Sequence, residues 1–269
     1  MPRWILLIVS SLFLAACSGG PRDHAALPEG TKPEPVPPAS EPGAVVHGTS
    51  HEGRPRVVRT HGQGLARVLV IGLIHGDEPE AFARFDDLWL RLTTAGYGNE
   101  VSLAGIESMN PDGFERGSRG NARGVDLNRN WPAGNFRPSR RRGAAPLTAP
   151  ETAAVHDFIM RFKPHVIVVF HSASSGPFVD PDGPEPMSID LADAFVRSAS
   201  RVNPAWHTRP DFTNPPGSLG TWYGLDEGRI VLTVEFLRGT DPVEALSVST
   251  AGTLAVLRSI ARDQLSSSP

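Results

Sequence analysis

An α/β fold with three layers, a sheet between two layers of helices, is the architecture that this sequence of 269 residues predicts. Short apolar runs rich in valine and isoleucine alternate with longer amphipathic segments between residues 44 and 265. Such alternation is typical of strands and helices that follow one another in an α/β domain. Some runs, such as Val166–Phe170, are apolar at every position, which indicates strands buried on both faces.

The individual elements are predicted from the apolar pattern and the flanking residues. Strands are expected at Arg56–Thr60, Val68–Ile74, Val101–Met109, Val166–Phe170 and Ile230–Leu237. Helices are expected at Pro79–Leu92, Pro150–Phe162, Ile189–Ser200 and Val243–Gln264. The second of these helices has a favourable start, because proline fits the first turn and Glu151 complements the positive end of the helix dipole. The sequence shows no internal repeat.

Two of the predicted strands are followed by residues of types that can bind zinc. His75 and Glu78 come after the run 68–74, and His171 directly follows the run 166–170. A catalytic zinc ion has three protein ligands, often histidine nitrogens and a carboxylate oxygen, and keeps a fourth position for water. Ligands at the ends of neighbouring strands can face one point beyond the sheet. We therefore expect one zinc ion per chain, bound by His75, Glu78 and His171.

The spacing His-x-x-Glu alone is weak evidence, since a glycine-containing turn with one histidine and one acid is common. Its context is more specific: Asn110-Pro-Asp-Gly113, Arg123-Gly-Val-Asp-Leu-Asn-Arg-Asn-Trp131 and Leu232-Thr-Val-Glu-Phe236 follow in order. With these motifs the chain resembles the zinc carboxypeptidases of the carboxypeptidase A type, and within them the bacterial murein peptide amidase branch. The likeness covers about residues 67–236 and implies a mixed, mainly parallel sheet of about eight strands.

The resemblance also implies a catalytic mechanism. His75, Glu78 and His171 match the zinc ligands, and Glu235 matches the general base that takes a proton from zinc-bound water. Arg119 matches the arginine that polarises the scissile carbonyl. These roles agree with general chemistry, because zinc lowers the pKa of bound water toward about 7, a carboxylate can carry the proton, and a guanidinium stabilises a developing oxyanion.

Three further residues have roles implied by the same likeness. Asn128 and Arg129 match the pair that holds the terminal carboxylate of the substrate, and Asp126 matches the carboxylate that orients the first zinc histidine. Arginine forms a planar fork that suits a carboxylate. Alternatively, Asp126 and Asn128 could be turn residues that bond their own backbone. We interpret Asn110-Pro-Asp-Gly113 as a turn that supports the loop rather than as part of the chemistry.

Glu235 lies within an apolar run, where an unpaired carboxylate is costly to bury, so a functional partner is the simpler explanation. An ion pair with Arg238 is the alternative. Two features depart from the pancreatic enzymes of the family. Phe212 stands where those enzymes carry a mobile tyrosine, and a phenyl ring has no hydroxyl to donate. Tyr223 lies on the wrong side of the neighbouring motif to replace it.

The second departure from the pancreatic enzymes is the segment Phe178–Pro184, and the expected substrate follows from it. The segment Phe178–Pro184 resembles the murein peptide amidase branch, which implies hydrolysis of the bond between γ-D-glutamate and diaminopimelate in a cell-wall peptide. Leu219, at the position that resembles the pocket floor, is apolar and cannot pair with a basic side chain. The second ammonium and carboxylate of diaminopimelate could instead meet Asp180, Asp182 or Arg209, and the sequence does not choose among them.

The N-terminus predicts delivery to a bacterial cell envelope. Residues 1–17 have a basic start, an apolar core and small residues before Cys17, as in a secretory signal. Leu14-Ala-Ala-Cys17 resembles a lipoprotein box, which implies an acylated Cys17 and, with Ser18 after it, an outer-membrane anchor facing the periplasm. An ordinary cleaved signal is the alternative. Residues 18–43 are expected to be a disordered, proline-rich linker, residues 44–265 the catalytic domain, and residues 266–269 a disordered tail.

Charge and cysteine content narrow the remaining possibilities. Cys17 is the only cysteine, so a disulfide framework is excluded. A formal net charge of −3 gives no indication of a nucleic-acid partner, and the arginine-rich run 137–142 is expected to be a solvated loop. The sequence indicates no partner protein. Two other functions stay open: an amidohydrolase of the aspartoacylase and desuccinylase type acting on acyl-amino acids, and a wall-binding module without catalysis.

Overall fold

The computed structural model describes residues 43–210, 212 and 214–266, with side chains up to Arg262. The predicted signal segment, Cys17 and the linker up to residue 42 lie outside these residues, as do residues 267–269 of the predicted tail.

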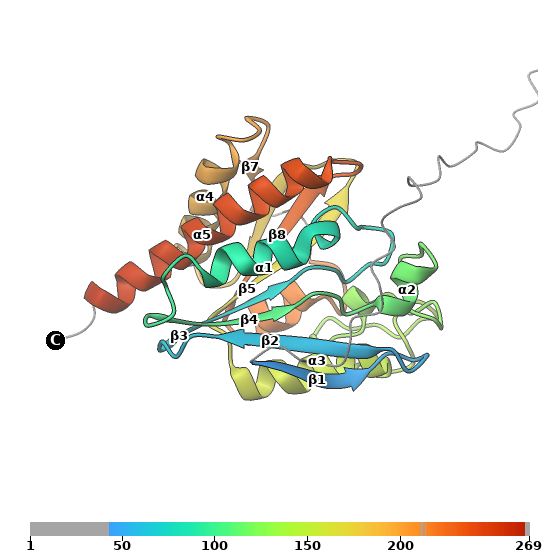
Figure 1. Cartoon of the computed structure of the whole chain (residues 1–269). Helices are drawn as coiled ribbons and strands as arrows, with labels where there is room; N and C mark the ends of the chain where they lie inside the picture. Colours follow the sequence, from blue (N-terminus) through green and yellow to red (C-terminus); the bar gives the residue numbers. More distant parts are fainter. Residues whose placement is uncertain (1–42, 211, 213, 267–269) are drawn as a thin grey trace, which may run out of the picture. The chain divides into compact units, whose positions relative to one another are not determined.

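Eight strands form one sheet in the order β1-β2-β4-β3-β5-β8-β6-β7 (Figure 1). Their bounds are β1 Ala44–Thr49, β2 Pro55–His61, β3 Ala66–Ile71, β4 Val101–Ile106, β5 Val166–Ala173, β6 Phe178–Asp182, β7 His207–Thr208 and β8 Ile230–Leu237. The four central strands, β4, β3, β5 and β8, are parallel to one another. The strands β2 and β6 flank them in antiparallel orientation, so the predicted mixed sheet is confirmed.

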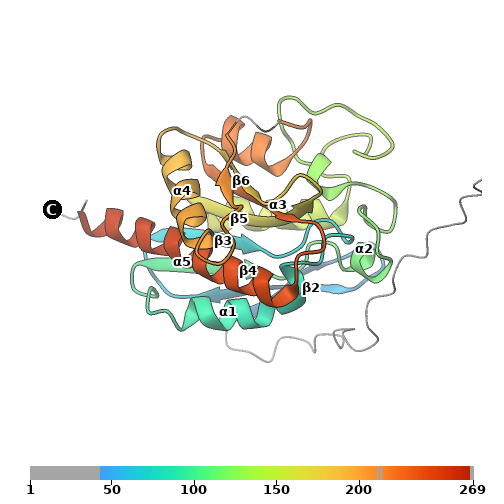
Figure 2. The same ribbon diagram turned by 90° about the horizontal axis from the view of Figure 1, so that it is seen from above.

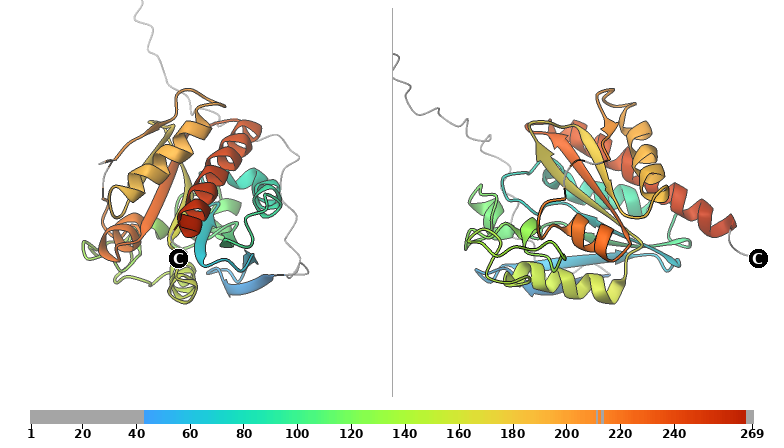
Figure 3. Two further views of the ribbon diagram at one scale, coloured as in Figure 1. Left: turned by 90° about the vertical axis from the view of Figure 1, so that its left-hand side faces the viewer. Right: turned by 180° about the vertical axis from the view of Figure 1, so that it is seen from behind.

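Helices cover both faces of the sheet. The helices α1 Phe85–Thr93, α4 Met187–Ala199 and α5 Pro242–Ser266 pack on one face, and α3 Pro150–Phe162 with a π-helix at Gly220–Asp226 packs on the other. Figure 2 shows α1 beside α5, and Figure 3 shows α4 beside α5 and, from behind, α3 below the sheet. The three predicted layers are therefore present.

The alternation of side chains along β3 shows how one strand serves both layers. Val68 and Val70 belong to the core under α1, α4 and α5, whereas Leu69 and Ile71 belong to the core under α3. Successive side chains of a strand point to opposite faces, so a strand covered on both faces must be apolar throughout.

Several predicted bounds need correction. The strand expected to reach Ile74 ends at Ile71, and the helix expected from Pro79 begins at Phe85 after a 3-10 turn at Phe82–Arg84. The motif Asn110-Pro-Asp-Gly113, predicted as a turn, opens the short helix α2 Pro111–Glu115. The Asn110 side chain accepts a hydrogen bond from the Gly113 backbone N–H at 2.9 Å and so caps this helix.

Within the described residues, one helical segment is long and apolar enough to cross a membrane by length and composition alone. It is residues 242–262 of α5, and half of its apolar window is buried inside the domain. Ala245, Val248 and Val256 of this segment are fully buried, as in a core helix.

Candidate metal centre and substrate cavity

The predicted zinc ligands come from two neighbouring strands of the sheet. His75 and Glu78 lie in the loop after β3, in a turn closed by a hydrogen bond of 3.1 Å from the Glu78 backbone N–H to the His75 carbonyl. Gly76 is required there, because a Cβ atom on it would lie 2.0 Å from the Gly113 carbonyl carbon of α2. His171 is inside β5 rather than after it, since that strand continues to Ala173.

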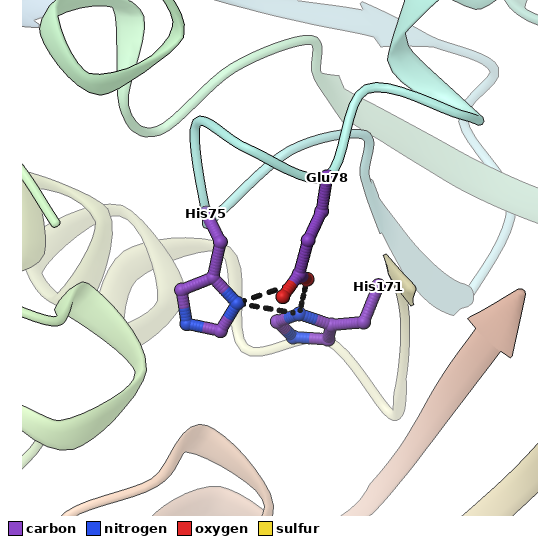
Figure 4. Close-up of side chains that lie close together, drawn as sticks. All are labelled: His75, Glu78 and His171. Carbon is purple, nitrogen blue, oxygen red and sulfur yellow. Dashed lines mark hydrogen bonds and ion pairs between the residues drawn. The ribbon is translucent and has the colours of Figure 1, made fainter. Parts of the chain in front are cut away.

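Three donor atoms of these residues face one point (Figure 4). Glu78 Oε2 lies 2.9 Å from Nδ1 of His75 and 2.9 Å from Nδ1 of His171, and the two Nδ1 atoms are 3.1 Å apart. All three side chains are buried. Two imidazole nitrogens and one carboxylate oxygen are the donor set that zinc prefers, and their convergence fits a single ion of this kind.

Asp126 orients the first histidine. Its Oδ1 lies 2.9 Å from His75 Nε2, so that Nε2 carries the ring proton and Nδ1 presents its lone pair to the other two donors. Burial by itself would raise the pKa of Asp126, but the hydrogen bond from His75 and the charge of Arg119 hold that pKa well below its usual range. Asp126 also accepts a hydrogen bond from the Asn128 backbone, so it forms the turn that the alternative interpretation predicted as well.

Glu235 lies beside His171, because the two residues are paired in the parallel register of β5 and β8. Its Oε2 atom is buried and has no hydrogen-bond partner among the described residues. Burial is the main cause that raises the pKa of Glu235. The alternative ion pair with Arg238 is not formed, since the Arg238 guanidinium instead lies 3.6 Å from Asp77 and 3.5 Å from Glu78.

Arg119 reaches the metal centre from the loop after α2. Its Nη1 donates to Glu78 Oε1 at 2.7 Å and its Nε donates to Asp126 Oδ2 at 2.9 Å. Burial alone would lower the pKa of Arg119, but the two carboxylates raise it. The guanidinium is therefore held, as a cation, next to the three converging donors.

Arg129 and Asn128 lie on the wall of the same cavity. Burial lowers the pKa of Arg129, and no carboxylate within the described ranges forms an ion pair with it. Its Nη1 donates only to the Asn128 carbonyl oxygen, at 2.6 Å. The Asn128 side chain does not bond its own backbone: its Oδ1 accepts from the Leu219 N–H at 2.9 Å and its Nδ2 lies 3.4 Å from His171 Nε2.

The cavity has a volume of about 260 Å³. It is lined by the three predicted zinc ligands, by the predicted base Glu235, and by Asn128 and Arg129, the predicted carboxylate clamp. Asp126 lies behind its wall, in contact with His75 and Arg119. Phe212, predicted to take the place of the tyrosine of the pancreatic enzymes, lines the cavity, and the centre of its ring lies 4.7 Å from that of Phe178. Tyr223 is buried away from the cavity and donates to the Pro164 carbonyl oxygen at 2.7 Å.

Some residues that line the cavity were not predicted from the sequence, and others were considered there only as alternatives. Ser172, Ala173 and Thr233 are neighbours of His171 and Glu235 along their strands, so their position follows from the strand register. Leu219, expected at the pocket floor, instead belongs to the core under α3, and its neighbours Ser218 and Gly220 line the cavity. Of the three residues considered for diaminopimelate, Asp180 and Asp182 line the cavity, whereas Arg209 packs against the Phe212 ring.

Several known proteins are similar to this chain in sequence. The pattern of the family described as zinc carboxypeptidase matches residues 42–185. Murein peptide amidase A of Escherichia coli (strain K12) is 29% identical over 229 residues, which are 74% of this chain and 85% of the relative. Murein peptide amidase A of Vibrio campbellii is 30% identical over 173 residues, which are 58% of this chain and 64% of the relative.

Solved structures share the fold. The murein-tripeptide amidase of Escherichia coli O157 superposes with a TM-score of 0.62 at 25% identity, over 83% of this chain and 93% of that chain. A metallo-carboxypeptidase of Burkholderia cenocepacia superposes with a TM-score of 0.62 at 22% identity, and the match covers 82% of this chain and 65% of that longer chain. The chain therefore belongs to the zinc carboxypeptidase family and is a zinc metallocarboxypeptidase.

Proposed function

We propose that this chain binds one zinc ion through His75, Glu78 and His171 and hydrolyses the amide bond to the C-terminal residue of a cell-wall peptide. The bond is the one between γ-D-glutamate and diaminopimelate. The observation that carries the proposal is a single cavity lined by three converging metal donors, by the Glu235 carboxylate, whose buried Oε2 has no hydrogen bond among the described residues, and by the half-buried Arg129 guanidinium. The murein peptide amidases among the relatives support the substrate class.

Glu235 is assigned the general base. When zinc is bound, it lowers the pKa of a water molecule toward about 7 and polarises a carbonyl group. The Glu235 carboxylate accepts the proton of the attacking water and returns it to the leaving nitrogen.

Three polar side chains position the substrate in this proposal. The guanidinium of Arg119, held by Glu78 and Asp126, donates to the carbonyl oxygen as it gains negative charge. Arg129 receives the terminal carboxylate in a two-pronged pair. Asn128 keeps the clamp next to the metal centre, because its side chain bridges the Leu219 backbone and His171.

The two other functions have less support. An amidohydrolase on acyl-amino acids shares the His-x-x-Glu and Asn-Arg elements, but Asn130-Trp131 after the clamp and the absence of an aspartate two residues before His171 favour the peptidase. A wall-binding module without catalysis has no need for a base such as Glu235 beside a metal site.

The test is mass spectrometry of L-Ala-γ-D-Glu-diaminopimelate after incubation with the zinc-loaded full chain and, in parallel, with its Glu235→Gln variant. Release of free diaminopimelate by the parent alone supports both the substrate and the base. Trimming of ordinary peptides while the tripeptide survives contradicts the substrate only. Cleavage of acyl-amino acids and of no peptide favours the amidohydrolase.

We further propose that Cys17 is acylated and anchors the chain to the outer membrane, with the catalytic domain in the periplasm. The lipobox-like Leu14-Ala-Ala-Cys17 and the adjacent Ser18 support this placement. Two or more acyl chains are enough for stable anchoring.

A further inference from the structure

Arg119, the proposed partner of the developing oxyanion, lies in a loop that is anchored to the interior of the domain. The loop continues from Arg119 to Asp126, and the residues between them are exposed or half-buried with one exception. The exception is Asn121, which is 4% exposed and lies two residues after Arg119. The contacts of the Asn121 side chain therefore limit the freedom of the arginine.

The Asn121 side chain closes a turn on one side and contacts a buried carboxylate on the other. Its Oδ1 accepts from the backbone N–H groups of Arg123 and Val125, each at 3.0 Å. Because both partners are donors, an oxygen must occupy this place and the amide nitrogen must point away from the turn. That nitrogen donates to Glu151 Oε2 at 2.9 Å. Asn121 thus joins the turn before Asp126 to the start of α3.

Glu151 is fully buried in the first turn of α3 and uses both of its carboxylate oxygens. Oε2 accepts from Asn121, and Oε1 accepts from the His51 backbone N–H at 2.8 Å. The start of a helix favours a negative charge. The buried Arg56 guanidinium also compensates this charge, since burial lowers the pKa of Arg56 to about 10 and the charge of Glu151 is the main effect that opposes the shift. One carboxylate therefore links the turn between β1 and β2, the loop of Arg119 and the helix α3.

The contact requires a hydrogen-bond acceptor on both sides of residue 151. Both partners, the His51 N–H and the Asn121 amide, are donors. A glutamine of the same size has one acceptor and one donor group, so one partner would face another donor in either orientation of its amide. Rotation of the Asn121 amide would not help, because its donor would then face the N–H groups of Arg123 and Val125. A buried donor without an acceptor is costly, so the loop would shift.

The backbone of Arg119 is held from the other side as well. The Asn110 side chain donates from Nδ2 to the Arg119 carbonyl oxygen at 3.2 Å. Asp126, at the far end of the loop, has anchors of its own, because its backbone N–H donates to the Arg141 carbonyl oxygen at 2.8 Å. Loss of the Asn121 anchor should therefore displace Arg119 more than Asp126.

We propose that Glu151 is a positioning residue for the reaction, which acts through Asn121 to hold the Arg119 guanidinium where the carbonyl oxygen gains negative charge. The proposal rests on the role of Arg119 in the proposed function and goes beyond it. Glu151 is not among the residues that line the cavity, so it acts through another residue. A displacement of about 1 Å in a group that contacts the reacting atoms can lower a rate by about 100-fold, so an anchor at this distance affects the reaction.

The experiment compares Glu151→Gln with a double variant that restores the contact. The double variant combines Glu151→Gln with Asn121→Asp. Its new carboxylate accepts from the N–H groups of Arg123 and Val125 and from the glutamine amide, and the glutamine oxygen accepts from the His51 N–H. Every donor again has an acceptor, the side chains keep their sizes, and the net charge equals that of the parent.

The zinc-loaded full chain and its variants are tested on L-Ala-γ-D-Glu-diaminopimelate and on benzoyl-glycyl-phenylalanine, so that an ordinary peptide is included. In Glu151→Gln, kcat is expected to fall by about 10- to 100-fold while KM changes by less than about threefold, because the guanidinium acts on the oxyanion of the transition state. The double variant is expected to regain kcat to within about threefold of the parent. Asp157→Asn, an exposed aspartate on α3 that gives the same change in net charge as Glu151→Gln, is expected to match the parent.

Two measurements that do not depend on turnover exclude simpler explanations. Competition with a chelator is expected to give a zinc affinity of Glu151→Gln within about threefold of the parent, because Asp126 keeps its own anchors. A loss of zinc affinity that accounts for the loss of kcat overturns the proposal. Thermal unfolding tests a role in stability alone. A Glu151→Gln protein that unfolds at a lower temperature but keeps the parental kcat below that temperature overturns the proposal too.

The route through Arg119 is tested by introducing Glu151→Gln into an Arg119→Ala protein. If Glu151 acts by holding the guanidinium, the second substitution lowers kcat by less than about threefold in this background. The same loss in both backgrounds overturns the proposal while the peptidase function stands. A parent protein that cleaves neither peptide contradicts the proposed function itself.

Discussion

His171 and Glu235 occupy paired positions on the neighbouring parallel strands β5 and β8. Adjacent strands are about 4.8 Å apart, so the separation of these two residues is set by the backbone hydrogen bonds of the sheet and not by a loop. The third and fourth groups, His75 and Glu78, come from the loop after β3, on the other side of β5. The sheet thus holds one proposed ligand and the proposed base rigidly, and the loop supplies the remaining ligands.

This arrangement predicts that Glu235→Gln abolishes hydrolysis without loss of zinc. The amide keeps the size of the side chain but cannot accept a proton, and general base catalysis contributes about 10²- to 10⁴-fold. The measurement is kcat together with the zinc content of the purified protein. Glu227→Gln, an exposed glutamate outside the cavity, is the control. Full activity of Glu235→Gln, or loss of its zinc, would contradict the assignment.

Asp126→Asn is expected to weaken zinc binding by about 10- to 100-fold, the usual effect of removing a carboxylate that orients a metal-binding histidine. The amide of this variant could still contact His75, but it would no longer favour the proton on Nε2. Competition with a chromophoric chelator measures the zinc affinity, and thermal unfolding of the variant checks the fold. Asp190→Asn on the exposed face of α4 is the control, and equal zinc affinity of the parent and Asp126→Asn would disprove the role.

Arg129→Lys is expected to raise KM for a peptide with a free C-terminal carboxylate by about 10-fold or more, because lysine keeps the charge and loses the planar fork. A peptide that ends in an amide should be a poor substrate for both proteins, with no further loss in the variant. Steady-state kinetics on the two peptides separates these effects. An equal rise in KM for both peptides would place Arg129 outside the carboxylate site. Arg140→Lys, in the exposed loop after the clamp, serves as the matched control.

Sequence patterns predicted the core strands and the convergence of His75, Glu78 and His171, because both follow from residue types within or directly after apolar runs. The runs around Val68, Val166 and Ile230 are apolar throughout, and each lies in a strand of the sheet. His75, Glu78 and His171 were recognised by residue type and by their position after such runs, and the structure brings their donor atoms together.

The elements at the sheet edges could not be predicted in the same way. The strand β6 contains Pro181 between two aspartates and has little of the pattern of a strand, yet it pairs with β8 along five residues. Its acidic side chains tolerate this position because they face the cavity. Position 220 needs glycine because the π-helix approaches Asp182 closely, and a Cβ atom there would lie 1.8 Å from Asp182 Oδ2. Residues 182 and 220 are distant in sequence. Contacts of this kind depend on tertiary packing, which a local pattern does not contain.

Cys17→Ser is expected to release the protein from the membrane fraction of a bacterial host and to abolish incorporation of labelled palmitate. Serine has no thiol for acylation, and the substitution leaves the proposed signal segment before it unchanged. Fractionation and labelling of the parent and the variant test the two effects separately. Palmitate labelling of Cys17→Ser, or a soluble parent protein, would rule out the lipid anchor.

The stability of the domain should depend on pH through Glu107, which lies after β4 at the edge of the core. Burial, assisted by the charge of Asp86 and opposed by that of Arg59, raises the pKa of Glu107 to about 7 in the folded protein, from an ordinary value of 4.5. The folded state therefore binds a proton more tightly than the unfolded state. The contribution of Glu107 to stability is therefore fully present below about pH 4.5 and is lost as the pH rises through the folded pKa of about 7.

Between pH 5 and pH 8 the free energy of unfolding should fall by roughly 2 kcal/mol more in the parent than in Glu107→Gln, whose side chain does not ionise. Urea unfolding of both proteins at the two pH values measures this difference, and parallel pH profiles of the two proteins would show that Glu107 is not the group responsible.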